Sequence, residues 1–493
     1  MAVQASICLL IIGCANHPKH QLAKPDATKI ALESDAADTH RPSISNDIAD
    51  STKSPDGSYE PLSEALAAAY SNNSKLNAAR AGVRVTDEDV AIAKSGYRPT
   101  IQALAEAEYS AIGGQRTGAG SLVVEIRQPI FDGFQTRNSV AASIETVRAS
   151  NESLRNTEQN TLLKAATAYM NVVRDRQIAE LFERDLRFQN EQVRASRARL
   201  EQSEGTVTDL AQAQAAKSAA IAQLAQARSQ MLASEAVYRE VVGASPGKLR
   251  TPGSTLPRLP RELDEALAIA LKEHPAILAR LHSVDAAAFS VKSVEGKLLP
   301  QLTASAGYAP RFSYGDSVNA LNEPGWNSET VNSAEIGATL SVPLYQGGRI
   351  AAQVRQSKEA LGQSRIEVDV VRDQVRVDLV SAWSRYISSR DEISANRKFV
   401  SASKLALEGV IEEQKVGQRT RLDVLNAQSE LVNAQINLAQ AEHDHVVATY
   451  ATLSAMGRLS ARQLRLGVEH YDPGSHYRAI KDKWYGLSTP NET

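Results

Sequence analysis

The stretch RQPIFDGFQTRNSVAAS, residues 127–143, decides the fold of this chain because a second version of it occurs further along. The counterpart is SVPLYQGGRIAAQVRQS, residues 341–357. Aligning the two stretches pairs Pro129 with Pro343, Phe131 with Tyr345 and Gly133 with Gly347. Each stretch stands between a segment of alternating polarity and a long run without proline, so each is predicted to be a junction between a strand and a helix.

The repeat extends well beyond these junctions. Residues 62–243 have a counterpart in 263–457, and both halves are predicted to run as a short helix, a helix, two strands, a very long helix and a shorter helix. Self-similarity of this length predicts an internal duplication within one architecture. The predicted parts are a signal segment at 1–14, a flexible tether at 15–59, a first repeat at 60–245, a linker at 246–262, a second repeat at 263–460 and a tail at 461–493.

Four segments alternate between apolar and polar residues with a period of two. They lie at 100–110, 121–127, 301–308 and 334–342, and polar loops are predicted at 113–121 and 315–329. Strands of about ten residues with one apolar face have the length of tilted transmembrane strands. A soluble hairpin with one wet face is the alternative. Because four strands cannot close a barrel and open edges are not tolerated in lipid, the membrane interpretation requires oligomerisation.

The remaining segments are predicted to be helical. Residues 133–200 and 347–416 contain no proline and little glycine, so each stretch can form one helix about 100 Å long. Their shorter partners, at 209–242 and 423–456, carry closely spaced alanines that allow helices to approach closely. The predicted fold class is therefore mostly α-helical with a membrane β-barrel part.

Composition and spacing argue against several other classes of protein. The net charge of −2 gives no electrostatic basis for binding nucleic acid, and no run reaches the roughly 20 apolar residues of a membrane-spanning helix. The glycine-rich segment 113–120 has no following helix and no lysine for a phosphate. His443 and His445 are two residues apart and face different sides of a helix, unlike a metal-binding pair. We therefore expect no enzyme, no cofactor and no metal.

The N-terminal residues predict an exported lipoprotein. Residues 7–14, ICLLIIGC, form a short apolar segment that ends in a small residue and a cysteine and resembles a bacterial lipobox. Lipid attachment at Cys14 would leave no thiol for a disulfide, because the other cysteine, Cys8, lies in the removed segment. No basic residue precedes the apolar segment, so either the true start lies upstream or the signal is atypical. An incidental apolar N-terminus is the alternative.

Together, the duplicated layout, the segments PIFDG (129–133) and PLYQGGR (343–349), and VGQRTRLDVLNAQSEL (416–431) resemble the TolC-like outer membrane factors. The resemblance covers about 60–460. It implies a homotrimer in which each chain gives four strands to one 12-stranded barrel, continued by a long α-helical barrel across the periplasm. It also implies contacts with outer membrane lipids, a periplasmic adaptor and an inner-membrane ABC or proton-driven transporter.

Two cues from the resemblance concern the exported substrate, and they conflict. PIFDGFQTRNSV and the tail at 471–487 look like family members that serve type I secretion of large proteins. The lipobox is commoner among members that serve multidrug efflux pumps. We expect type I secretion, with multidrug efflux as the alternative. A periplasmic coiled-coil scaffold without a pore is the alternative of another class.

The resemblance further implies a gate at the periplasmic end, where coiled-coil tips are held by carboxylate and arginine contacts. Asp209 matches the aspartate of the first repeat, and Arg419 and Asp423 match an arginine and an aspartate of the second. Asn426 replaces a second mouth aspartate, and Gln414 replaces a tyrosine, so the acidic ring and the latch are expected to be weaker. Ordinary helix caps and solvated helix ends are the alternative interpretation of these charges.

Overall fold

The structure is a computed structural model that describes residues 59–113, 115–252, 257–318 and 324–490. The predicted signal segment, lipid-attachment residue Cys14 and nearly all of the tether lie outside the described residues. The first repeat contains α1 (Leu62–Asn72), α2 (Ser74–Ser95), β1 (Thr100–Ile112), β2 (Gln115–Phe131), α3 (Gln135–Glu201) and α4 (Val207–Val242). The second contains α5 (Leu263–Glu273), α6 (Pro275–Gly296), β3 (Gln301–Val318), β4 (Pro324–Ser341), α7 (Arg349–Lys415) and α8 (Arg421–Ala455), followed by α9 (Gly474–Ile480).

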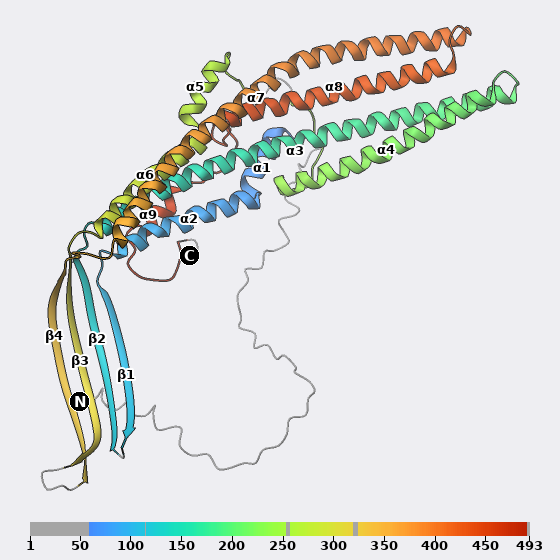
Figure 1. The fold of residues 1–493 in the computed structure, drawn as a ribbon. Helices are drawn as coiled ribbons and strands as arrows, with labels where there is room; N and C mark the ends of the chain where they lie inside the picture. The colour runs from blue at the N-terminus through green and yellow to red at the C-terminus, as the bar shows by residue number, and fades with distance from the viewer. Residues whose placement is uncertain (1–58, 114, 253–256, 319–323, 491–493) are drawn as a thin grey trace, which may run out of the picture. The chain divides into compact units, whose positions relative to one another are not determined.

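The four strands form one antiparallel sheet in the order β1-β2-β3-β4 (Figure 1). Pairing of β2 with β3, for example Val124 opposite Tyr308, joins the two repeats into this sheet. Strands β1 and β4 are therefore its edges. Large apolar side chains on these strands face solvent in the single chain: Ile101 is 69% exposed and Ile336 is 87% exposed.

The strands are longer than the alternating pattern predicts. β1 has 13 residues, β2 has 17, and β3 and β4 have 18 each, instead of about ten. The predicted loop bounds are wrong, since Gly118 pairs with Tyr109 and Asn327 pairs with Gly315 inside segments that were expected to be loops. A ladder of backbone hydrogen bonds does not depend on side-chain polarity, so the loss of apolar alternation does not end the strands.

The long helices have the predicted extent. α3 and α7 contain 67 residues each, and each packs along a shorter partner, α4 and α8 respectively (Figure 1). Within the described residues, no helix combines the length and the apolarity that crossing a membrane would require. The fold class predicted from the sequence, two repeats that are mostly helical with a small sheet, is confirmed.

The main core lies where α1, α2, α3, α4 and the end of α8 meet. Its centre holds two fully buried tyrosines, Tyr169 and Tyr238. Tyr169 Oη donates to the carbonyl oxygen of Glu60 at 2.7 Å, and Tyr238 Oη donates to Glu60 Oε1 at 2.6 Å. The buried hydroxyls are thus satisfied, and they hold the start of the first repeat against both helices.

Candidate functional site

The first strand–helix junction is packed within the chain. The pairing of β2 with β3 shifts register between Pro129 and Phe131. This shift is expected because proline has no backbone N–H to donate to the ladder. Gly133 then turns the chain with a φ of +69°, and a Cβ there would lie 2.3 Å from the carbonyl oxygen of Gly296 in α6. The close approach of α6 therefore requires glycine at position 133, in addition to the left-handed backbone conformation.

The second junction repeats the backbone turn without the packing. Gly347 and Gly348 have φ angles of +60° and +77°, and a Cβ at either position would meet no atom within 4 Å. β4 ends at Ser341, two residues before Pro343, and Leu344 and Tyr345 that follow the proline are 93% and 86% exposed. In the single chain this junction is a protruding apolar segment.

At the first helical tip, between α3 and α4, Asp209 is the third residue of α4 and forms a capping box with Thr206, the residue before the helix. Its Oδ2 accepts hydrogen bonds from the Thr206 hydroxyl at 2.7 Å and the Thr206 backbone N–H at 3.2 Å. These bonds lower the pKa of Asp209. Ser203 takes the left-handed conformation in the preceding turn, with a φ of 63°.

The second tip, between α7 and α8, has the same capping box. Asp423 Oδ2 accepts from the Thr420 hydroxyl and backbone N–H, both at 2.8 Å, and these bonds lower the pKa of Asp423. Arg419 Nε donates to Glu413 Oε2 at 2.8 Å rather than to Asp423 or Asp209. Within one chain, the predicted gate residues therefore lie at two tips and act as helix caps and a local ion pair. Asn426 lies one turn further along α8 and is exposed.

One residue that the sequence did not single out joins the two helical hairpins. Arg421 is only 9% exposed, and its Nη1 donates to Ser196 Oγ at 2.9 Å and to the carbonyl oxygen of Gln192 at 3.0 Å, both in α3. Burial, more than nearby Arg199, lowers the pKa of Arg421. A cation in the first turn of a helix is unfavourable to the helix dipole, and this is the signal that could have marked the residue.

A second buried contact lies further along the same pair of helices. Gln428 Nε2 in α8 donates to Asp185 Oδ1 in α3 at 2.9 Å, and both side chains are buried. Because buried polar groups are costly to separate from their partners, Arg421 and Gln428 together fix the position of the α7/α8 hairpin against α3.

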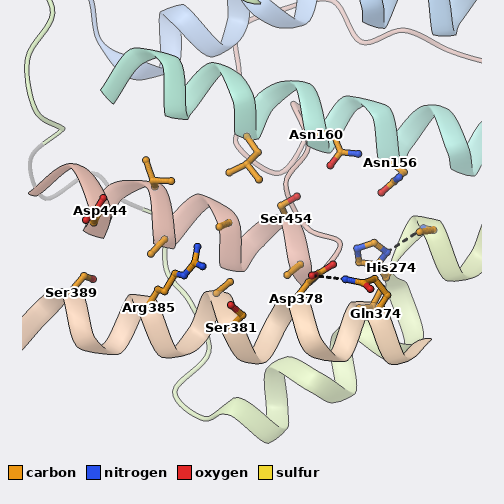
Figure 2. A pocket seen from close by; sticks show the side chains of 18 of the residues that line it. Asn156, Asn160, His274, Gln374, Asp378, Ser381, Arg385, Ser389, Asp444 and Ser454 are labelled. Atoms are coloured by element: carbon orange, nitrogen blue, oxygen red, sulfur yellow. Dashed lines mark hydrogen bonds between the residues drawn. The ribbon is translucent and has the colours of Figure 1, made fainter. Parts of the chain in front are cut away.

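A cavity of about 920 Å³, lined by both polar and apolar side chains, lies between α3, α7 and α8 (Figure 2). Asn156 and Asn160 of α3 face Asp378 and Arg385 of α7 across it. His274 lines one end, and burial lowers the pKa of its imidazole. Valine and alanine side chains of α7 and α8 complete the lining, so polar and apolar groups share this space between the helices.

The histidines of α8 face different neighbours, as predicted. His443 Nε2 lies 2.8 Å from Asn171 Oδ1 in α3, whereas His445 Nδ1 lies 2.9 Å from Ser389 Oγ in α7. Burial lowers the pKa of both imidazoles. They are interhelical contacts on opposite sides of the helix.

One cluster in the described part of the chain has metal-ligating groups close together: Glu145 in α3 with His282 and Asp285 in α6. Glu145 already accepts from Arg148 at 2.6 Å and lies 2.8 Å from His282 Nδ1. These contacts account for the cluster as a polar bridge between the two helices.

Comparison with known proteins gives both repeats one assignment. The family model described as "Outer membrane efflux protein" matches residues 65–244 and 266–458. The chain belongs to the outer membrane efflux protein family. It is 52% identical over 439 residues to "Outer membrane efflux protein BepC" of Brucella suis, covering 88% of this chain and 93% of that protein. The expected location in the outer membrane is thereby confirmed.

More distant sequence relatives and a solved structure support the same assignment. "Outer membrane protein TolC" of Vibrio cholerae is 27% identical, covering 62% of this chain and 70% of that protein. "Alkaline protease secretion protein AprF" of Pseudomonas aeruginosa is 26% identical, covering 71% and 72%. Among solved structures, the Campylobacter jejuni CmeC outer membrane channel superposes with a TM-score of 0.70 at 14% identity, covering 94% of this chain and 98% of that one. These relatives are outer membrane or secretion proteins and not enzymes, and the TolC-like resemblance is confirmed.

Proposed function

We propose that this chain forms the outer membrane exit channel of a tripartite export system that expels small toxic compounds. The observation that carries the proposal is the 52% identity to a protein named an outer membrane efflux protein, extending over 93% of its length. The channel would work with a periplasmic adaptor and a proton-driven or ABC transporter of the inner membrane. The sheet would contact outer membrane lipids.

A homotrimer accounts for the surfaces that a single chain leaves uncovered. The sheet has two open edges, β1 and β4, which lipid does not tolerate. α7 also exposes Ile366, Val370 and Val377 on the long helix, and the second junction exposes Leu344 and Tyr345. Three chains that share one barrel would pair the edges and cover these apolar side chains.

Protein secretion is the second candidate, and two observations favour it. AprF, named an alkaline protease secretion protein, aligns with 71% of this chain. The junction segment 129–140 and the tail at 471–487 also resemble members that serve type I secretion. The sequence cues conflict and give secretion as the first expectation, whereas the higher identity to BepC supports efflux as the leading proposal.

Deletion of the gene and complementation with the full chain separate the two functions. For efflux, we expect the deletion strain to become several-fold more sensitive to bulky antibiotics and bile-type detergents, while its set of secreted proteins is unchanged. Loss of a large secreted protein with unchanged drug sensitivity would replace efflux with type I secretion. Neither defect, together with a failure to conduct ions in planar bilayers, would leave a non-channel coiled-coil scaffold.

We further propose that the helical tips hold the periplasmic entrance closed. Arg419 is exposed and Asp209 and Asp423 are half-buried, so all three can reach the tips of neighbouring chains, while Arg421 holds the second tip to α3 within each chain. Asn426 would line the mouth without adding charge. Each contact is individually weak in water, but a trimer repeats every contact three times, so opening requires several to break together.

Bilayer conductance tests this gate. We expect a higher conductance and a leakier cell for Arg419→Ser and for the double variant Asp209→Ala/Asp423→Ala, with normal trimer yield. Arg194→Ser is the matched control, because Arg194 is an exposed arginine near the first tip that pairs only with Glu191 on its own helix among the ion pairs of the described residues. Unchanged conductance in the triple variant Asp209→Ala/Arg419→Ser/Asp423→Ala would show that the gate is held elsewhere.

A further inference from the structure

The tail that follows the second repeat is held along α2 and runs toward the start of β1. His476 Nδ1 lies 3.0 Å from Asp87 Oδ2, and both side chains are buried. Further on, Lys94 Nζ donates to the carbonyl oxygen of Lys481 at 2.8 Å and to Asp482 Oδ1 at 3.0 Å. The tail is therefore fixed to α2 by a buried contact and by an exposed one nearer the sheet.

A further contact, made by Arg98, brings the tail to the base of the sheet. Arg98 Nη1 donates to the carbonyl oxygen of Lys483 at 3.1 Å, and the Arg98 guanidinium lies 4.6 Å from the centre of the Trp484 ring. Arg98 is separated from the first residue of β1, Thr100, by Pro99 alone. Trp484 is thus held beside the point where the chain enters the sheet.

Large side chains at this point face solvent. Trp484 is 67% exposed, Tyr485 is 90% exposed, and Leu487 is fully exposed. Tyr97, on the α2 side of the same contact, is 54% exposed. A fixed backbone that presents large apolar and amphipathic side chains to water is typical of a contact surface.

The charges around these aromatic residues are predominantly positive. The segment 478–488 contains three basic residues, Arg478, Lys481 and Lys483, against one acidic residue, Asp482. Asp482 pairs with Lys94, and Arg478 pairs with Asp472 just before the segment, so Lys481 and Lys483 are the basic side chains of this segment that make no ion pair within the described residues. A surface of tryptophan, tyrosine and lysine has the chemistry that favours the headgroup layer of a membrane carrying negative charge.

We propose that Tyr97, Lys481, Lys483, Trp484, Tyr485 and Leu487 form a tail surface that binds anionic phospholipid headgroups at the periplasmic face of the outer membrane. This inference rests on the proposed function, because the sheet must lie in the membrane for its base to meet that face. The tail surface adds an attachment outside the barrel. It lies where the helices end and the strands begin, so it sets the depth at which the sheet is inserted.

Fluorescence of single-tryptophan variants tests the proposal in the full chain. The chain has three tryptophans, Trp326, Trp383 and Trp484, so Trp326→Phe/Trp383→Phe leaves the tail residue alone. The reconstituted protein is placed in phosphatidylethanolamine vesicles containing phosphatidylglycerol, with lipids brominated either near the headgroups or near the chain ends. We expect a blue-shifted emission that bromine near the headgroups quenches more strongly than bromine near the chain ends.

Two controls keep failure of this inference distinct from failure of the channel. A variant that retains only Trp383, a buried residue of α7, should not be quenched. A variant with all three tryptophans replaced by phenylalanine and Ile336→Trp on exposed β4 reports insertion of the sheet. Where the double variant folds poorly, the loss of quenching caused by Trp484→Phe in the otherwise native chain gives the same information.

Each outcome decides the proposal. Quenching of the Ile336→Trp variant with no quenching of Trp484 would overturn the tail surface and leave the channel intact. This holds whether the emission wavelength of Trp484 is that of a tryptophan in water or of one covered by protein. No quenching at either position would overturn both. Lys481→Gln/Lys483→Gln should reduce Trp484 quenching in phosphatidylglycerol but not in phosphatidylcholine. An equal response in the two lipids would overturn the preference for anionic headgroups.

Discussion

The two strand–helix junctions share a sequence pattern but differ in what surrounds them. At the first, Gly133 packs against Gly296 within the chain. At the second, Gly347 turns the chain in open space and Tyr345 projects into solvent. A duplicated sequence therefore produces one junction that is complete within a chain and one that is open, which is what a shared barrel requires of a chain that must join its neighbours.

The largest effect expected from this difference comes from the packed glycine. Gly133→Ala places a methyl group 2.3 Å from a backbone oxygen in addition to straining a left-handed residue, and we expect a loss of folding stability of about 3 kcal/mol or more. Gly347→Ala carries only the backbone strain, about 1 kcal/mol. Trimer yield and thermal inactivation of the purified protein measure both. Equal losses for the two variants would remove the distinction between the junctions.

The exposed aromatic of the second junction provides the next test. If neighbouring chains cover Tyr345, Tyr345→Ala should weaken the assembled protein by about 2–3 kcal/mol per chain and lower the temperature at which trimers dissociate on a gel. Phe131→Ala is the matched variant, because the Phe131 ring packs on Phe134 of its own chain, with 5.1 Å between the ring centres. That variant should alter the stability of the chain more than the dissociation of the trimer. A Tyr345→Ala trimer as heat-resistant as the native one would show that this residue remains exposed in the assembly.

The two helical tips extend the comparison. Their capping boxes match, but the residue that follows the capping threonine differs. Arg421 of α8 occupies the place that exposed Val207 has in α4. Arg421→Val removes the hydrogen bonds that a buried cation makes to Gln192 and Ser196 of α3, a loss of about 2 kcal/mol, and makes the second tip like the first. We expect raised bilayer conductance with normal trimer yield. Val207→Arg, which adds an exposed charge at the first tip, is the control. An equal rise in conductance for Val207→Arg would show that the conductance does not depend on the Arg421 contact.

The sequence predicted what periodicity and repetition can encode. The order of elements, the extent of α3 and α7 and the position of the junctions follow from the absence of proline and from the paired glycines. It did not predict the ends of the strands, because backbone ladders continue through polar residues such as those at 115–120. It also missed Arg421, because the burial of that side chain depends on α3, which is more than 200 positions away in the chain.

The smallest effect is expected where the two repeats agree. Asp209 and Asp423 each accept two hydrogen bonds from the threonine that starts the helix, and these bonds lower both pKa values. A carboxylate whose folded pKa is depressed stabilises the folded chain above its unfolded pKa of about 3.9, and that stabilisation is lost as the pH falls through the folded pKa.

Asp209→Asn and Asp423→Asn should therefore have small, similar effects on thermal stability at neutral pH, and the effects should disappear in acid. Thermal unfolding followed by circular dichroism between pH 7 and pH 2 measures this. Both groups lie near the surface, so solvent screening keeps the effect below that of Arg421→Val. A much larger loss for Asp423→Asn alone would show that the second tip carries a contact between chains that the first tip lacks.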